Sequence, residues 1–222
     1  MNGEQGTATI PAQGEHTATL IFLHGLGDNG GNWVATFQSV RIPYIKYIFP
    51  TAPIIPVTWQ NDMEMPAWFN VKSLSYHEYD ADERGIRNAV KKVHAMVQDE
   101  IKTGTPSNRI ILGGFSQGGG LALHSGLTFD QPLAALIGLS CRLPLPKRIT
   151  SERRININIP ILHCHGDADL VTPTDITHRV HNTIKEFNKN HTFKMYPRMV
   201  HTTCDREMQD VKEFIIKHVA PK

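Results

Sequence analysis

The chain has 222 residues, 40% of them hydrophobic, and its 23 basic and 21 acidic residues give a net charge of +2. This length suits one domain with a sizeable core, and the dispersed charge, with no Lys/Arg block, argues against a dedicated nucleic-acid binder. No apolar run approaches the roughly 18 residues that a membrane span needs.

The polar start, Met1–Gly6, lacks the order of a signal peptide, and it carries neither a myristoylation pattern nor a cysteine. Three cysteines without framework spacing indicate reduced thiols. We therefore expect a cytoplasmic protein. The sequence carries no signal for its oligomeric state.

The first half of the chain alternates apolar runs with glycine- or proline-rich segments. Residues 1–16 are predicted as a loose or edge-paired arm, and Thr17–Leu23 as a buried strand that enters a glycine-rich loop. A helix is expected around Trp33–Val40, and Tyr47–Phe49 is predicted as a second strand. The segment Thr51–Glu78 has no steady period, but its Pro, Trp and Met content favours a functional loop over disorder.

From Asp82 the pattern becomes helical, with apolar residues on one face: Ile86, Val90, Val93, Val97 and Ile101. A short apolar run, Ile110–Leu112, then leads into Gly114-x-Ser116-x-Gly118. This is the nucleophile-elbow pattern, in which a serine projects from a sharp strand-to-helix turn. The alternative is a plain glycine-rich turn with a solvated serine.

The second half continues the alternation. Buried strands are predicted over Ala134–Leu139 and Ile159–Cys164, separated by a basic, polar surface excursion over 142–158. A helix, the strand Thr192–Tyr196 and a terminal helix follow. The sequence therefore predicts a single α/β domain over 1–222, with an α/β-hydrolase type of mainly parallel central sheet and helices on both faces. Functional sites in such sheets lie at the carboxyl ends of the strands.

Three candidate catalytic residues follow predicted strands in the order Ser116, Asp169, His201. This is the chain order expected of an α/β-hydrolase triad. The histidine would take the serine proton as a general base, and the carboxylate would fix the imidazole tautomer.

Other residues compete for these roles. Asp167 competes for the acid, but its position favours a turn residue. Four histidines compete for the base: His24 is read as ordering its loop, and His94, His178 and His181 as lying on helix surfaces or flanks. A metal site built from His163, His165, Asp167, His201 and Cys204 is disfavoured, because His163 needs burial and zinc-like spacing is absent.

An oxyanion hole needs two preorganised N–H donors. The backbone N–H of Gln117, directly after the candidate nucleophile, is one candidate. The other is the backbone N–H of Leu26, in a glycine-rich loop that lets the main chain approach a ligand. The alternative for this loop is a plain glycine turn.

Several long motifs resemble the acyl-protein thioesterase/lysophospholipase family, in this order along the chain: Leu20–Asp28, Phe49–Pro53, Met65–Phe69, Pro106–Gly119, Leu139–Cys141 and His165–Asp167. The resemblance implies a single-domain cytosolic α/β-hydrolase that removes S-acyl groups, typically palmitoyl, from protein cysteines. It also implies activity on lysophospholipids and simple esters. It assigns Ser116, Asp169 and His201 as the triad and Leu26 and Gln117 as the oxyanion donors.

The apolar loop after Thr51 could supply a channel for an acyl chain, and we expect Val71, Leu74, Trp68 and Arg142 to line it. Two positions depart from the family pattern. Arg142 stands where relatives carry Trp, and Lys72 lies in a lip that is more apolar in relatives. Both departures concern the substrate and leave the triad untouched.

The leading interpretation is a thioesterase that acts on S-acylated proteins, with a transient encounter with a membrane surface. The first alternative is a lysophospholipase or broad carboxylesterase that uses the same triad. A third is a non-catalytic protein that binds an acyl ligand or a partner, against which the complete triad argues. The triad supplies nucleophile, base and electrostatics, so no cofactor or metal is expected. The small, dispersed charge likewise gives no reason to expect a nucleic-acid partner.

Overall fold

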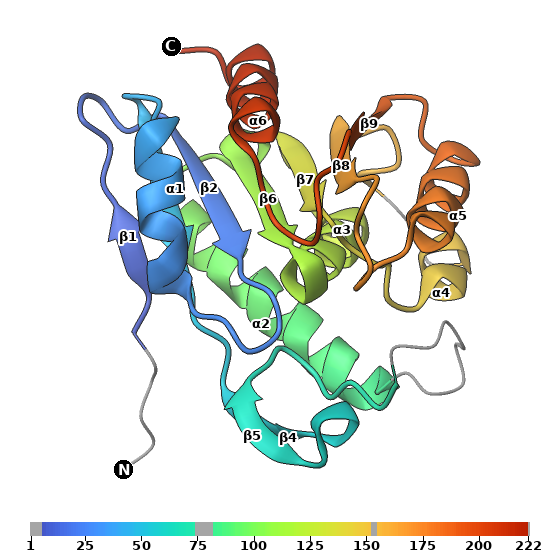
Figure 1. Cartoon of the computed structure of the whole chain (residues 1–222). Helices are drawn as coiled ribbons and strands as arrows, with labels where there is room; N and C mark the ends of the chain where they lie inside the picture. The colour runs from blue at the N-terminus through green and yellow to red at the C-terminus, as the bar shows by residue number, and fades with distance from the viewer. Residues whose placement is uncertain (1–5, 74–81, 152–154, 222) are drawn as a thin grey trace.

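The computed structural model describes residues 6–73, 82–151 and 155–221. Within these ranges, seven strands form one sheet (Figure 1). Their spatial order is β1 (Ala8–Ile10), β3 (Ile45–Phe49), β2 (Ala18–Leu23), β6 (Ile110–Phe115), β7 (Ala135–Leu139), β8 (Ile161–Gly166) and β9 (His191–Tyr196). Every neighbouring pair is parallel except β1 and β3 at one edge. The predicted mainly parallel sheet is therefore confirmed.

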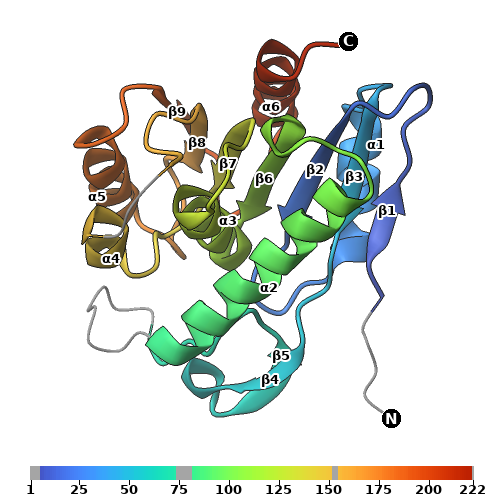
Figure 2. The ribbon, with the colours of Figure 1, turned by 180° about the vertical axis from the view of Figure 1, so that it is seen from behind.

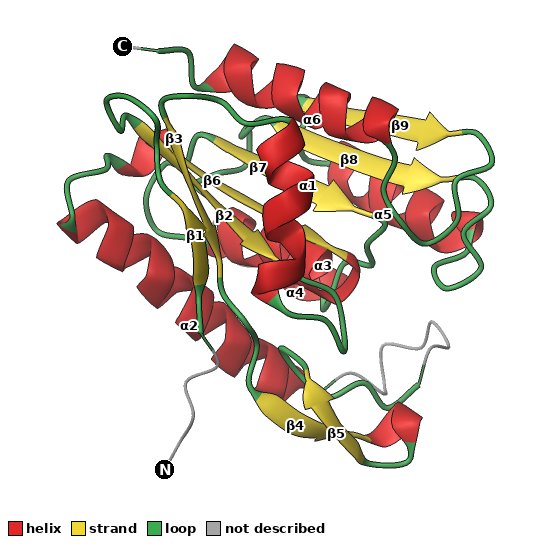
Figure 3. Ribbon diagram, turned by 60° about the vertical axis from the view of Figure 1, so that its left-hand side comes forward, coloured by secondary structure: helices red, strands yellow, loops and turns green. Residues whose placement is uncertain are grey.

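Helices pack on both faces of the sheet, as Figure 3 shows. One face carries α1 (Trp33–Ser39) and α6 (Asp205–His218). The other carries α2 (Glu83–Lys102), α3 (Ser116–Thr128), α4 (Pro146–Ser151) and α5 (Thr174–Lys185). None of the helices in the described ranges is both long and apolar enough to span a membrane.

The strands are apolar throughout because both of their faces are buried. Leu20 and Phe22 of β2 pack in the layer with α1, whereas Ile21 and Leu23 pack in the opposite layer with α3. Figure 2 shows α2 lying diagonally across that second layer beside α3, and Glu100 of α2 hydrogen-bonds Thr19 of β2 and Lys46 of β3 directly. Because β2, β6 and β8 run in the same direction, their carboxyl ends lie at the same edge of the sheet.

The arm and the strand boundaries differ little from the predictions. Within 1–16, residues Ala8–Ile10 pair antiparallel with β3, so this part of the arm is edge-paired. Strand β8 runs to Gly166, two residues beyond the predicted end at Cys164. His163 and His165 therefore lie inside the strand, on the face toward α5.

The prediction of an irregular loop over 51–78 is wrong for its first half. This half contains a hairpin of β4 (Ile54–Val57) and β5 (Met63–Pro66), which pair with each other outside the main sheet. Neither strand buries a regular face. Since no face is consistently buried, the sequence shows no alternation, and the prolines in both strands hide the pattern further.

The prediction of a polar surface excursion over 142–158 is also wrong in part. Leu143 and Ile149 are buried in the core, and Ile149 belongs to α4. Asn156 is buried as well, and its amide hydrogen-bonds the main chain at Leu133, Gly126, Phe129 and Gln131. Basic and other polar residues together outnumber the apolar residues of this stretch, so its average polarity conceals the burial of a few side chains.

A carboxyl group is buried without a hydrogen-bond partner in the first turn of α6. Glu207 is 0% exposed, and neither of its carboxyl oxygens has a partner within the described chain. Burial, followed by the charge of Asp210, raises its pKa from 4.5 to about 8. The unfolded chain therefore loses this proton at lower pH than the folded chain does. The contribution of this group to stability is greatest below pH 4.5 and falls as the pH rises toward 8.

We expect Glu207→Gln to remove this pH dependence, because the amide keeps the shape but does not ionise. The free energy of unfolding of the variant, relative to the native chain, should rise by roughly 2–4 kcal/mol between pH 5 and 8. Urea unfolding at three pH values in this range measures it, with the exposed Glu213→Gln as the matched control in the same helix. A difference that does not change with pH would contradict the assignment.

Candidate active site

The turn from β6 into α3 places Ser116 at a sharp bend. Ser116 has a left-handed backbone, with φ of 52°, which an L-residue adopts only at a cost of about 1–3 kcal/mol. Glycines surround it because the main chain passes very close to its neighbours. A Cβ atom at Gly114 would lie 2.5 Å from the Gly118 carbonyl, and one at Gly118 would lie 2.3 Å from the Leu23 carbonyl oxygen. This is the local geometry of a nucleophile elbow.

The structure brings the three predicted triad residues together. His201 Nε2 lies 2.9 Å from Ser116 Oγ, and His201 Nδ1 lies 2.7 Å from Asp169 Oδ2. A carboxylate oxygen only accepts, so Nδ1 carries the hydrogen and Nε2 is the acceptor for the serine hydroxyl. His201 is therefore set as a base toward Ser116.

The Asp169 carboxylate is buried and held by its own loop. Its Oδ1 accepts hydrogen bonds of 2.8 Å from the backbone N–H groups of Val171 and Thr172. Burial acts to raise the pKa of this carboxyl, but the hydrogen bonds from His201 and the Thr172 N–H outweigh burial, so its pKa lies below the ordinary value. Asp169 is thus ionised and can stabilise an imidazolium.

The competing residues have other partners. Asp167 accepts a hydrogen bond from the Arg198 backbone N–H in a turn. His24 is fully buried, and its Nδ1 donates to the Gly25 carbonyl while its Nε2 accepts from the Ala52 N–H. His94 bonds the Ser125 carbonyl, His181 stacks on Phe193, and His178 meets the same ring edge-on.

The loop after β2 lies against the elbow. A Cβ atom at Gly25 would lie 3.3 Å from Ser116 Cβ. The loop is fixed by a hydrogen bond from Gly27 N–H to the Pro66 carbonyl, and Gly27 has a φ of 76°. Leu26 and Gln117 line the same cavity as Ser116, so the two predicted oxyanion residues share this cavity with the predicted nucleophile.

Trp68, which was expected to line an acyl channel, instead lies in the core. It is 5% exposed and is absent from the cavity wall. Its indole Nε1 donates to the His24 carbonyl, and its backbone N–H donates to Gln117 Oε1. Gln117 Nε2 in turn donates to the Phe69 carbonyl. An indole N–H that needs a buried acceptor turns the ring inward, so the prediction for Trp68 is wrong.

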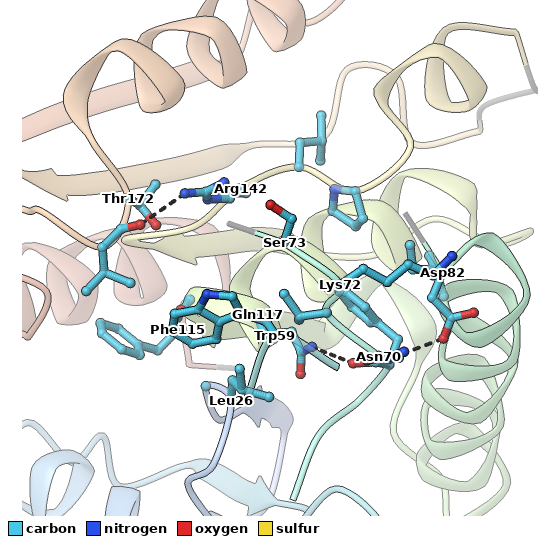
Figure 4. A pocket seen from close by; sticks show the side chains of 18 of the residues that line it. Leu26, Trp59, Asn70, Lys72, Ser73, Asp82, Phe115, Gln117, Arg142 and Thr172 are labelled. Atoms are coloured by element: carbon cyan, nitrogen blue, oxygen red, sulfur yellow. Dashed lines mark hydrogen bonds between the residues drawn. The ribbon is translucent and has the colours of Figure 1, made fainter. Parts of the chain in front are cut away.

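A mainly apolar cavity of about 360 Å³ opens beside Ser116, within the 300–1,000 Å³ or so of ligand pockets. Val71 and Arg142, two of the four residues expected to line an acyl channel, lie in its wall. Leu74, another of the four, falls outside the described residues. Figure 4 shows Arg142 with Thr172 at one end and Lys72, Asn70 and Asp82 at the other.

Several residues of the cavity wall were not predicted. Trp59 and Phe69 come from the segment around the hairpin, and Leu143 to Pro146 come from the stretch expected to be a surface excursion. Val171 and Thr172 follow Asp169 directly. The closeness in sequence of these unpredicted residues to the predicted site residues is the one signal that could have identified them.

A metal centre does not form from the candidate ligands. Among the residues that the structure describes, no three His, Cys, Asp or Glu side chains are grouped so as to hold a metal ion. His163 is buried with its Nε2 3.2 Å from Thr177 Oγ1, and His165 faces the Thr172 carbonyl.

Comparison with known proteins gives consistent matches over nearly the whole chain. A family profile described as Phospholipase/Carboxylesterase matches residues 4–219. The chain is 36% identical to acyl-protein thioesterase 1 of Neurospora crassa over 95% of its own length and 90% of the relative's. Among solved structures, maize acyl-protein thioesterase 2 is 30% identical with a TM-score of 0.85, covering 97% of this chain and 99% of that one. Arabidopsis thaliana SOBER1 is also 30% identical, with a TM-score of 0.86, covering 91% and 99%.

We expect Gly118→Ala to disrupt the elbow, because the new methyl group would overlap the carbonyl oxygens of Leu23 and His24. Backbone atoms cannot move aside as a flexible side chain can, so a loss of about 3 kcal/mol or more in the free energy of unfolding is expected. Thermal unfolding measures it. Gly14→Ala is the matched control, since a Cβ atom there meets nothing within 4 Å. Equal melting temperatures for the two variants would contradict the close approach.

Proposed function

Because this chain belongs to the phospholipase/carboxylesterase family, we propose that it hydrolyses S-acyl thioesters of protein cysteines, of the palmitoyl type, through an acyl-enzyme on Ser116. It is an enzyme that hydrolyses esters or thioesters, as its relatives are. One observation carries the finer assignment: an unbroken hydrogen-bonded chain from Ser116 through His201 to Asp169 beside an apolar cavity.

In the first step, Ser116 Oγ attacks the thioester carbonyl carbon. His201 Nε2, 2.9 Å away, takes the hydroxyl proton as the new C–O bond forms. The resulting imidazolium is stabilised by the ionised Asp169 at 2.7 Å. The left-handed backbone of Ser116 keeps the hydroxyl projecting from the turn.

The carbonyl oxygen becomes an oxyanion in this step. The backbone N–H groups of Gln117 and Leu26 are its donors in the proposal, since both residues line the cavity beside Ser116. Gln117 also lies in the first turn of α3, where main-chain N–H groups are unpaired within the helix and negative charge is favoured. Neither donor has to move for the reaction, which is what makes such stabilisation effective.

The intermediate then collapses by breaking the C–S bond. A thiol has a pKa of about 8.5, so the sulfur leaves readily and needs little help from the His201 proton. His201 gives its proton to the departing sulfur and is neutral again. Water then enters, His201 takes one of its protons, and the hydroxide attacks the acyl-enzyme carbonyl. Collapse of this second intermediate breaks the C–O bond to Ser116 Oγ, which takes back the proton from His201, and releases the fatty acid.

The cavity supports a long acyl chain as the group transferred. Its wall is mainly apolar, and the large side chains of Trp59, Phe69 and Ile86 contribute to it. Burial of each methylene of the chain contributes about 0.8 kcal/mol. The cysteine side of the substrate would remain at the mouth, near the triad.

An oxygen-ester substrate such as a lysophospholipid is the second candidate, favoured by the family description. The triad and the apolar cavity would serve it equally. The difference lies in the leaving group, because an alkoxide needs its proton from His201 far more than a thiolate does. The rates on the two substrates therefore separate the candidates.

We expect the wild-type protein to release free thiol from an S-palmitoyl cysteine peptide. In Ser116→Ala the rate of release should fall about a thousandfold or more. Thiol formation followed with a disulfide reagent measures the rate. Fatty acid release from a lysophosphatidylcholine is measured in parallel, with circular dichroism as the check that both proteins are folded. Activity that survives in Ser116→Ala would overturn the proposal, and activity on the lipid alone would replace its substrate.

We expect Val71→Thr to weaken binding of long acyl chains specifically. The two side chains have nearly the same shape, but threonine places a hydroxyl in the apolar wall, so KM for a palmitoyl substrate should rise about tenfold. An acetyl thioester, which is too short to reach the wall, should be unaffected and serves as the control. Equal changes for both substrates would show that Val71 does not line an acyl channel.

A further inference from the structure

A second buried histidine lies beside the proposed triad acid. His165 is in β8, four residues before Asp169, and both side chains are 0% exposed. Its Nε2 lies 2.8 Å from the Thr172 carbonyl oxygen and 3.5 Å from Asp169 Oδ2. The triad mechanism as derived above makes no use of this ring.

The contact with Thr172 fixes the state of the ring. A carbonyl oxygen can only accept, so Nε2 carries the hydrogen and donates it. Nδ1 is buried and has no hydrogen-bond partner among the described residues. Burial lowers the pKa of His165 below its ordinary value, against the opposing effects of the Thr172 hydrogen bond and the Asp169 charge. The ring is therefore neutral, and its single N–H is committed to Thr172.

This hydrogen bond completes a clamp on the loop that follows Asp169. Thr172 gives its N–H to Asp169 Oδ1 at 2.8 Å and receives the His165 N–H on its own carbonyl. The neighbouring Val171 carbonyl accepts from Arg142 Nη2 at 3.0 Å, at the end of the cavity shown in Figure 4. The main chain at 171–172 is thus held both from the strand and from the cavity wall.

The consequence for Asp169 follows from burial. Thr172 is 3% exposed, so without His165 its carbonyl would have to find another partner, and the loop would shift to provide one. A shift at Thr172 moves the N–H that holds Asp169 Oδ1, and with it the angle at which Oδ2 meets His201. The loop therefore transmits the position of His165 to the triad.

We propose that His165 is a positioning residue, which holds the loop 169–172 so that the Asp169 carboxylate keeps its orientation toward His201. The proposal rests on the proposed function, since it takes Asp169 as the triad acid. His163 provides the contrast: it lies two residues earlier on the same face of β8, is equally buried, and bonds Thr177 in α5 instead.

A pair of amide substitutions separates positioning from general stability. In His165→Gln the side-chain N–H can reach the place of Nε2 and bond Thr172, whereas in His165→Asn it falls short. We expect kcat on the thioester peptide to fall about tenfold to hundredfold in His165→Asn, the usual loss when a group that orients a functional side chain is removed. His165→Gln should stay within about threefold of wild type, and KM should change little in both.

Two controls complete the experiment. His163→Asn, equally buried, should lower the melting temperature without lowering kcat per folded enzyme, with active sites counted by a serine-reactive fluorophosphonate. In an Asp169→Asn background, His165→Asn should cause no further loss, because its effect passes through Asp169. Equal kcat for His165→Asn and His165→Gln, or additive losses in the double variant, would overturn the inference.

The Ser116→Ala variant keeps the two proposals distinguishable. If it loses activity while His165→Asn behaves like His163→Asn, only the role of His165 fails. If it retains activity, the proposed triad fails and the role of His165 fails with it.

Discussion

The close approach of the turn after β6 to the end of β2 is the constraint on which the rest of the site depends. The backbone at Gly118 lies against the Leu23 carbonyl so tightly that even a methyl group would overlap it. This contact sets Ser116 and Gln117 beside the loop at Gly25 and Leu26. Because both partners are main chain at the ends of buried strands, their relation does not depend on flexible side chains. The proposed nucleophile and the proposed oxyanion donors are therefore built into the sheet.

Buried hydrogen bonds extend this rigid centre outward in two directions. Toward the cavity, the Gln117 side chain joins the elbow to the segment at Trp68, and the Trp68 indole joins that segment to the His24 carbonyl. Toward the acid, the loop after Asp169 wraps its carboxylate with main-chain donors. The Asp169 carboxylate and the Trp68 indole are buried and hydrogen-bonded, and such networks hold one arrangement because every alternative leaves a buried polar group unpaired. The wall that would hold an acyl chain and the proposed triad acid thus share one framework.

The sequence predicted the sheet, its helices and the order of the candidate triad, because each of these is written locally. A buried parallel strand is a short apolar run, and the residue that follows it lies at the edge where all such strands end. Ser116, Asp169 and His201 could therefore be placed at one edge before any contact was known. The hairpin at 54–66 and the buried residues within 142–158 were not predictable in this way. Neither presents a regular buried face, so hydrophobic periodicity carries no information about them.

The sequence by itself determined which chemical groups are available. These are a serine on a strained turn, a candidate base, a candidate acid and a glycine-rich loop, and each was recognised from neighbours a few residues away. The tertiary structure alone decided which side chains meet. Trp68 turns its indole to a carbonyl 44 positions earlier in the chain and so leaves the cavity wall, while Arg142 reaches a carbonyl 29 positions later. His165 becomes a neighbour of the acid only because the loop folds back on its own strand. Such contacts depend on the relative placement of whole segments, which no local pattern encodes.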